Sequence, residues 1–292
     1  MQTSPLSEII VDGREFLVKR DDLIDPYLAG NKYRKLYTLL KTPKDTYTTL
    51  ISYGGTQSNA MLALAALCKQ KGWQYIYYTK PLSQRQKASK IGNYVAALSL
   101  GMQHKEIEAA LYRDFIASLQ LTVTQDVCLV HQGGAVDAAK VGLHVLAEEL
   151  REQLREYKNS PQALATPSGT GTTALFLALA MPEYTIYTTP CVGDVAYLQE
   201  QMRSLHPTLP ENLKILAPQK KYHFAKPYGE FYAIYEKLKN GGIEFDLLYA
   251  PAMWQALLEQ TQEKILYIHS GGVSGNASML ERYRKIDKER LK

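Results

Sequence analysis

Short β-forming runs alternate with amphipathic helical segments along this chain of 292 residues, and this alternation constrains its fold more than any other feature. Strands that are separated by helices form parallel sheets with helices on both faces, so the pattern predicts an α/β protein. The expected strands are 48–52, 74–79, 102–105, 128–131, 164–166, 184–188, 213–216, 247–249 and 265–269. The expected helices include 58–70, 87–100, 107–119, 137–157 and 171–181. In such sheets ligands bind beyond the carboxyl ends of the strands, where the chemically informative phrases of this chain also lie.

The length of the chain allows more than one hydrophobic core. The segment 46–125 contains strand–helix units of its own, although no Pro/Gly-rich linker marks its ends. We therefore predict a small α/β domain at 46–125, inserted into a large domain formed by 1–45 and 126–292.

The composition excludes several classes of function. Hydrophobic residues make up 46% and charged residues 22% of the chain, as in an ordinary globular protein, and the net charge of +5 is too small to predict nucleic-acid binding. The three cysteines, Cys68, Cys128 and Cys191, show no C-x-x-C spacing, so neither a disulfide framework nor a zinc site is expected. No segment has the length of a membrane span, and the first residues do not resemble a signal peptide. We expect a cytoplasmic protein with no metal and no membrane partner.

One lysine stands in an unusual context. Lys32 follows a Gly-Asn turn and begins an apolar helix among other basic residues, which include Lys35. Desolvation and neighbouring cations both lower the pKa of a lysine from its reference of about 10.4. A neutral amine can form a Schiff base with a carbonyl group. Taken alone, the phrase favours the simpler alternative of a turn, a helix start and a solvated basic face.

A second phrase joins a strand to a helix at 54–59, with the sequence Gly-Gly-Thr-Gln-Ser-Asn. The glycines permit close approach of the backbone, and the free N–H groups of a helix N-terminus attract anions. Ser58 and Asn59 therefore suit an anionic group such as a substrate carboxylate. The alternative is an ordinary helix cap by Ser58, for which the phrase is more elaborate than necessary.

A third phrase, at 166–174, also joins a strand to a helix. Its successive N–H groups and hydroxyls can surround a phosphate, and they come from Ser168, Gly169, Thr170, Gly171, Thr172 and Thr173. The phrase is neither a Walker A loop nor G-x-G-x-x-G, which favours a monophosphate; the alternative is a tight strand–helix turn. We expect the two glycines to let the backbone approach the anion, and a valine at Gly171 to intrude on it.

These three phrases together describe a site for pyridoxal 5′-phosphate. That cofactor is an aldehyde with one phosphate, is bound as a Schiff base, and acts as an electron sink for carbanions. Lys32 would take the aldehyde, the loop at 168–173 the phosphate, and Ser58 with Asn59 a carboxylate or phenolate.

The ordered set of motifs resembles the D-cysteine desulfhydrase and 1-aminocyclopropane-1-carboxylate deaminase family, which has the tryptophan synthase β-like fold, or fold type II of the pyridoxal-phosphate enzymes. The resemblance covers nearly the whole chain. The matching segments are 19–22 with 30–36, 54–59, 92–93, Gln132-Gly133-Gly134, the phosphate loop, 226–227, 248–250 and 268–272.

The resemblance implies a role for each cofactor residue. Lys32 would bind the cofactor and also move the α-proton of the substrate. Lys35 and the backbone of 168–173 would hold the phosphate, and Asn59 would bond the pyridine 3′-oxygen. Ser270 would meet the pyridine nitrogen, and its neutral hydroxyl would leave that nitrogen largely unprotonated, which suits elimination.

The resemblance also implies which residues contact the substrate, and here the chain departs from the family. Ser58 would lie against the substrate carboxylate and Tyr249 near its side chain. Ala60 replaces a usual His or Gln, Ala250 replaces the Glu of the deaminases, and Phe224 replaces a usual tyrosine. The missing carboxylate and hydroxyl argue against opening of a cyclopropane ring, with Tyr222 and His223 as candidate replacements.

We therefore expect a lyase, in the form of a homodimer, that catalyses α,β-elimination from a small amino acid. The first choice of substrate is D-cysteine, with pyruvate, ammonia and sulfide as products. The alternatives are a 1-aminocyclopropane-1-carboxylate deaminase, a non-catalytic pyridoxal-phosphate-binding protein with an altered pocket, and an α/β ligand-binding domain without cofactor.

Overall fold

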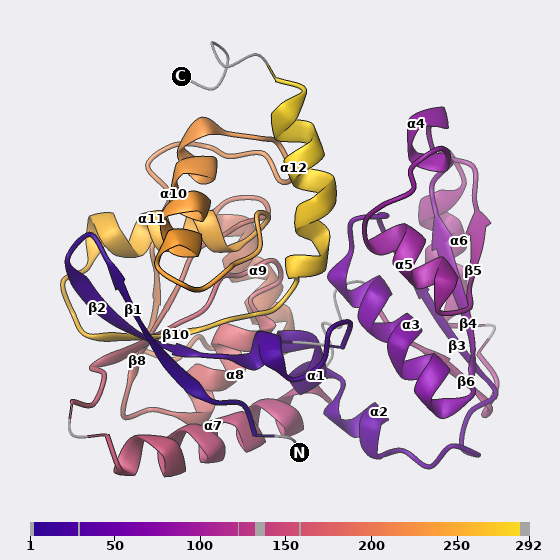
Figure 1. The fold of residues 1–292 in the computed structure, drawn as a ribbon. Helices are drawn as coiled ribbons and strands as arrows, with labels where there is room; N and C mark the ends of the chain where they lie inside the picture. Colours follow the sequence, from indigo (N-terminus) through magenta and orange to yellow (C-terminus); the bar gives the residue numbers. More distant parts are fainter. Residues whose placement is uncertain (1–2, 29, 122, 132–137, 158, 287–292) are drawn as a thin grey trace.

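The protein contains two β-sheets, each flanked by helices, in a computed structural model that describes residues 3–28, 30–121, 123–131, 138–157 and 159–286 (Figure 1). The larger sheet has six strands in the order β1-β2-β10-β7-β8-β9. These strands are β1 (Leu6–Val11), β2 (Arg14–Lys19), β7 (Ala163–Ala165), β8 (Thr185–Thr188), β9 (Leu213–Ile215) and β10 (Ile265–Ile268). All of its pairings are parallel except that of β1 with β2.

The smaller sheet has four parallel strands in the order β5-β4-β3-β6. They are β3 (Thr49–Tyr53), β4 (Gln74–Thr79), β5 (Met102–Glu106) and β6 (Val127–Leu129). Between β2 and β3 lie η1 (Asp21–Leu23), α1 (Asn31–Lys35) and α2 (Tyr37–Lys41). The helices that accompany the smaller sheet are α3 (Asn59–Lys71), α4 (Gln84–Lys87), α5 (Asn93–Ser99) and α6 (Tyr112–Leu119). The remaining helices are α7 (Ala139–Arg155), α8 (Thr172–Ala180), α9 (Val195–Leu205), α10 (Gly229–Asn240), α11 (Ala250–Gln260), η3 (Val273–Gly275) and α12 (Asn276–Arg284).

The central strands of the larger sheet are apolar throughout because both of their faces are covered. Successive side chains of a strand point to opposite faces, and β10 follows this rule. Leu266 and Ile268 pack in one cluster with α7, α8 and α9, whereas Ile265 and Tyr267 pack in another with α10 and α11. The larger part therefore has three layers, with the sheet between two groups of helices (Figure 1).

The smaller sheet has its own core. The helix α3 is nearly all apolar and packs with α5 on the strands β3 and β4, in a cluster that includes Leu50, Met61 and Tyr75. The helix α6 contacts the sheet through Phe115, whose ring lies 4.7 Å from that of Tyr78. The smaller sheet and its helices lie beside α1 and α12 of the larger part (Figure 1).

The predicted α/β arrangement with parallel sheets is confirmed, with differences in detail. The residues 247–249, predicted as a strand, form a turn instead, because the Asp246 carboxylate accepts the N–H groups of Leu248 and Tyr249 and α11 begins directly afterwards. Of the helix predicted at 87–100, only Asn93–Ser99 forms one continuous helix, α5, which begins after Gly92 with its φ of 96°; α4 ends at Lys87. The hairpin β1–β2 was not predicted.

The domain boundaries stay a prediction, with one correction to the sheet membership they imply. The strand β6, at Val127–Leu129, pairs with β3 of the smaller sheet, although the boundary at 125/126 assigns it to the large domain. In the described part of the chain, no helix combines the length and the apolar character that crossing a membrane requires.

Candidate active site

A cavity of about 430 Å³ opens at the carboxyl ends of the larger sheet's strands, between the two parts of the fold. Every residue predicted for the site lines it, and these residues are Lys32, Lys35, Ser58, Asn59, Ser168, Gly169, Thr170, Gly171, Thr172, Tyr249 and Ser270. They come from α1, from the loops before α3 and α8, and from the segments before α11 and after β10. Their roles stay predictions, but the fold brings them to one place.

A glycine brings Lys32 close to Ser270. Gly30 precedes α1 with a φ of 61°, and a Cβ atom built on it would lie 2.0 Å from the carbonyl oxygen of Ser270. The N–H of Asn31 donates to that same oxygen at 3.3 Å. Only glycine allows this approach of two backbone segments, so the Gly-Asn turn fixes the start of α1 against the loop after β10.

Arg34 anchors the other face of α1. Its guanidinium, which is fully buried, donates to Asp21 at 2.6 and 2.9 Å and to Glu149 of α7 at 2.7 Å. The helix α7 can approach so closely because its Gly142 has no side chain; a Cβ there would lie 1.9 Å from the Arg34 carbonyl oxygen. Since these bonds leave the helix little freedom, the backbone of Lys32 is held in a defined position.

The two cavity lysines are both easy to deprotonate. Burial lowers the pKa of Lys32 to about 8. Burial and the positive charge of Lys32 hold the pKa of Lys35 well below its usual value. The desolvation that was inferred from the sequence therefore shapes the site, and the positively charged form of Lys35 needs an anion beside it.

The loop before α8 has unused hydrogen-bonding groups for an anion. Gly171 caps α8 in the left-handed conformation, so the first N–H groups of the helix face the cavity without an internal acceptor. The hydroxyl of Thr173 is buried and makes no hydrogen bond among the described residues. Together with Lys35, these donors fit a phosphate group at this end of the cavity.

The loop after β10 is fixed by His269. Its Nδ1 accepts the N–H of Gly271 at 3.1 Å, so the hydrogen is on Nε2, which donates to the carbonyl of Glu244 at 2.9 Å. This histidine is fully buried, and its hydrogen bonds give it a structural role. It holds Ser270 at the cavity wall.

The side of the cavity predicted for substrate contains Ser58, Phe224 and Tyr249. Ser58 caps α3, because its Oγ accepts the N–H of Met61 at 3.2 Å, and its side chain also hydrogen-bonds to the buried Tyr77. The Phe224 ring lies 5.2 Å from the Tyr249 ring. Ser58 is therefore a helix cap and also lines the cavity, so the two interpretations do not exclude each other.

Neither of the suggested replacement acids reaches the cavity. The Tyr222 hydroxyl donates to Gln255 at 3.0 Å, and His223 is not among the lining residues. Ala250 is 1% exposed and belongs to the core cluster beneath α11. Among the described residues that line the cavity, none carries a carboxylic acid.

Some lining residues were missed. Val192, Tyr197 and Gln201 border the cavity from α9 and the segment before it. The signal was available, because this segment follows β8, the neighbour of β7 in the sheet. The predicted motif Gln132-Gly133-Gly134 lies outside the described residues.

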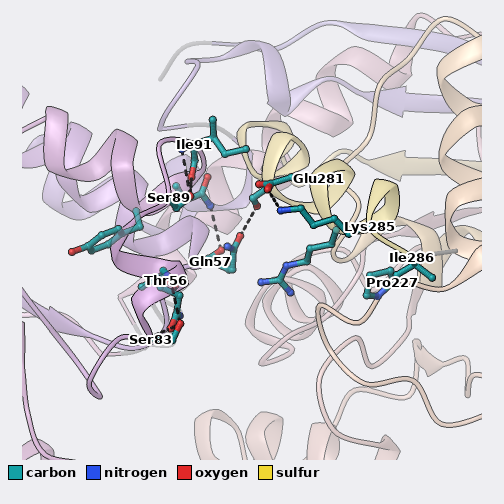
Figure 2. Close-up of a pocket in the computed structure, with 14 residues that line it drawn as sticks. Thr56, Gln57, Ser83, Ser89, Ile91, Pro227, Glu281, Lys285 and Ile286 are labelled. Atoms are coloured by element: carbon teal, nitrogen blue, oxygen red, sulfur yellow. Dashed lines mark hydrogen bonds and ion pairs between the residues drawn. The ribbon is translucent and has the colours of Figure 1, made fainter.

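A second pocket of about 550 Å³ lies beside the first, between α12 and the loops around α4 and α5 (Figure 2). Gln57 lines both pockets. The pocket walls carry both signs of charge, with Glu281, Arg282 and Lys285 on the side of α12.

The two glycines of the phosphate loop are expected to respond differently to valine. A Cβ on Gly169 points toward Tyr249 with a nearest distance of 3.4 Å, whereas a Cβ on Gly171 would meet Met202 of α9 at 2.5 Å, with a φ of 75°. Gly171→Val should therefore destabilise the fold, which corrects the expectation that it would intrude on the anion. Gly169→Val should keep the fold and weaken pyridoxal 5′-phosphate binding on the order of 10-fold, since overpacking typically costs about 1–3 kcal/mol. Thermal melting and cofactor titration of both variants check this; equal melting temperatures would contradict it.

The comparisons with known proteins agree with the sequence resemblance. No family model matches the chain. A protein of Thermotoga maritima, whose proposed activity is that of a 1-aminocyclopropane-1-carboxylate deaminase, is 25% identical over 287 residues, with 90% of each chain covered. A D-cysteine desulfhydrase of Salmonella choleraesuis is 25% identical over 292 residues, with 89% of this chain and 87% of that protein covered. The chain is similar to both proteins over most of its length.

The fold comparison gives the same result. The crystal structure of a 1-aminocyclopropane-1-carboxylate deaminase homologue superimposes with a TM-score of 0.74 at 21% identity, covering 96% of this chain and 94% of that one. The predicted resemblance and the type II fold are thereby confirmed. The homologous deaminases and desulfhydrases are pyridoxal-phosphate-dependent enzymes.

Proposed function

We propose that this protein is a pyridoxal-phosphate-dependent lyase that eliminates a β-substituent from a small amino acid, with D-cysteine as the first choice of substrate. The observation that carries the proposal is the position of Lys32, whose pKa burial lowers to about 8, in the same cavity as the donors before α8. A nucleophilic amine at one end and an anion site at the other match a cofactor that has an aldehyde and a phosphate.

The residues present fit this cofactor. The loop 168–173 and Lys35 would hold its phosphate, Asn59 its phenolate oxygen and Ser270 its ring nitrogen. When bound, the cofactor supplies an aldehyde that binds the substrate amine and a ring that withdraws electrons from the Cα atom. Ser270 offers a hydroxyl rather than a carboxylate to the ring, so it does not enforce a positive charge there.

The protein's own groups then orient the substrate and move its proton. Ser58, at the N-terminus of α3, would hold the substrate carboxylate with a hydroxyl and the positive end of the helix. The Lys32 amine, neutral in part at physiological pH, can take the proton from Cα. Tyr249 and Phe224 close the apolar side of the cavity, where the β-substituent would lie.

The choice of elimination over ring opening is supported by the described lining of the cavity, in which the two departures from the family pattern supply no acid. Sulfide leaves a β-carbon without the help of an acid, whereas a cyclopropane carbon needs a proton donor. Ala250 and Phe224 supply none. The alternatives remain a 1-aminocyclopropane-1-carboxylate deaminase, which is the activity named for the T. maritima relative, and a non-catalytic cofactor-binding protein.

A panel of D- and L-amino acids with the cofactor-loaded protein tests this proposal. With D-cysteine or β-chloro-D-alanine as substrate, each turnover should release one molecule of ammonia and one molecule of a 2-oxo acid. Cofactor binding without turnover of any substrate would favour the non-catalytic alternative, and a protein that binds no cofactor would refute the proposal. The homodimer and the cytoplasmic location also stay predictions.

The rate of cofactor capture should depend on pH with a midpoint near 8. Only the neutral amine attacks an aldehyde, and Lys32 has a pKa of about 8. The rate should therefore rise about tenfold per pH unit below the midpoint and level off above pH 9 or so. Stopped-flow absorbance after mixing cofactor-free protein with pyridoxal 5′-phosphate measures it. A rate that still rises steeply at pH 10 would contradict the lowered pKa.

A further inference from the structure

Asn59 carries an amide whose two ends have opposite hydrogen-bonding character. Its Nδ2 group only donates and its Oδ1 atom only accepts. A phenolate oxygen in the cavity can only accept, so Asn59 serves it only if Nδ2 is the end that faces it. What sets this orientation is therefore a functional question about the site.

Asn93 of α5, fully buried, lies directly behind Asn59. The Nδ2 group of Asn93 donates to Asn59 Oδ1 at 2.7 Å and to the backbone carbonyl of Gln57 at 3.2 Å. A backbone carbonyl cannot donate, so the Gln57 oxygen requires that Asn93 present Nδ2 on this side. The second hydrogen of that Nδ2 group then points to Asn59, which must accept it with Oδ1.

The opposite end of Asn93 is fixed from the other part of the fold. The hydroxyl of Ser274, in η3, donates to Asn93 Oδ1 at 3.0 Å. The Gln57 segment is also held from that side, because the Ser278 hydroxyl of α12 donates to Gln57 Oε1 at 2.9 Å. Asn93 thus has a defined donor side and a defined acceptor side.

The consequence for Asn59 is a single orientation. With Oδ1 turned to Asn93, its Nδ2 lies on the side of the loop after β10, where a Cβ added to Gly272 would be only 2.4 Å away. Asn59 itself lines the cavity, as does Ser270 of that loop. The glycine leaves room for the amide nitrogen beside the backbone.

We propose that Asn93 is a positioning residue that makes Asn59 a hydrogen-bond donor toward the phenolate oxygen of the cofactor. The chain of bonds runs from the Ser274 hydroxyl through Asn93 to Asn59 and ends at the cavity. This inference rests on the proposed function, because the acceptor that it serves is a group of pyridoxal 5′-phosphate.

Two substitutions at Asn93 distinguish orientation from packing. Asn93→Asp keeps the size, and its ionised carboxylate, the form expected at high pH, can only accept, so Asn59 turns its Nδ2 to that carboxylate and presents Oδ1 to the cofactor. Asn93→Ala removes the constraint and leaves Asn59 free to choose either orientation. A packing role predicts that the truncation is the worse change, whereas the positioning role predicts that the aspartate is worse.

Titration of the cofactor-free proteins with pyridoxal 5′-phosphate, followed by absorbance, measures the effect without any turnover. The dissociation constant should rise roughly 10- to 100-fold in Asn93→Asp, as for the loss of a hydrogen bond to a charged group, and less in Asn93→Ala. The absorption maximum of the bound cofactor should also shift in Asn93→Asp. Adding Asn93→Asp to Asn59→Ala should have no further effect, since the group that Asn93 orients is then gone.

Asn212→Asp is the matched control. Asn212 Nδ2 donates to three backbone carbonyls, those of Ala178, Met181 and Tyr184, so the same change removes buried donors outside the site. It should lower the melting temperature and leave the dissociation constant unchanged. Wild-type affinity in folded Asn93→Asp would overturn the inference alone. If the aspartate variant does not fold, a loss of affinity in Asn93→Ala as large as that in Asn59→Ala would overturn it, because only a packing role predicts such a loss. Absence of cofactor binding by the wild-type protein would overturn the proposed function instead.

Discussion

Replacement of Lys32 with alanine should lower the rate of elimination by about 10³-fold or more, since proton transfer by a positioned group is typically worth about 10²–10⁴-fold and the covalent attachment is lost as well. Part of the affinity for the cofactor should remain, because the donors before α8 and Lys35 are untouched. Rates of 2-oxo acid formation and a cofactor titration of the variant measure both effects.

Borohydride reduction assigns the attachment directly. Reduction of the loaded wild-type protein, followed by peptide mapping, should place the cofactor on Lys32. Lys35 is the relevant competitor, because it lines the same cavity and its pKa is also lowered. Lys69→Ala, on the exposed side of α3, is the control and should retain full activity. Attachment of the reduced cofactor to Lys35 instead would refute the assignment of Lys32.

The site could be predicted from the sequence because the fold is regular where the site lies. Parallel strands of one sheet end at a common edge, so segments that follow neighbouring strands meet there, as 166–174 after β7 and Ser270 after β10 do. The segment 54–59 follows β3 of the smaller sheet and lines the same cavity from the other part of the fold. The Gly-Asn turn before Lys32 was also informative. Its glycine is required by the close approach to Ser270, which is a physical reason for that phrase.

Other features depended on contacts that are distant in sequence. An apolar run at 247–249 has the composition of a buried strand, and the capping of its N–H groups by Asp246 overrides that propensity. A Cβ on Gly171 would meet Met202 of α9, and no local sequence pattern shows that this helix lies beside the loop. The bond from Asn93 to Asn59 likewise joins residues on different helices.

The missed hairpin had a local signal that was not used. Asp12 and Gly13 connect β1 to β2, with φ angles of 51° and 76°. An Asp-Gly pair between apolar runs is typical of a two-residue hairpin turn, because both positions need a positive φ. The search for alternating strands and helices passed over it, since antiparallel pairs do not belong to that pattern.

Ring opening of 1-aminocyclopropane-1-carboxylate should be slower than elimination from β-chloro-D-alanine by at least about 10²-fold, the lower end of what a positioned proton donor contributes. A ring carbon is a poor leaving group and needs a proton donor. The described cavity contains few groups that could be that donor. Ala250 is buried in the core beneath α11, Phe224 has no proton to give, and the Tyr222 hydroxyl is directed to Gln255. Parallel assays of 2-oxo acid formation from both substrates measure the ratio.

Tyr249 contributes a phenol to the substrate side of the described cavity, and its surroundings make it a weak acid. Burial and the Asp246 carboxylate raise the pKa of the Tyr249 phenol above its usual value, which lowers its tendency to release a proton. Tyr249→Phe should therefore change elimination of chloride little through proton transfer. Phe224→Tyr, which restores the hydroxyl that the family carries, should raise ring opening relative to elimination. Comparable rates on both substrates in the wild-type protein would contradict this argument, and selective loss of ring opening in Tyr249→Phe would then identify that phenol as the acid.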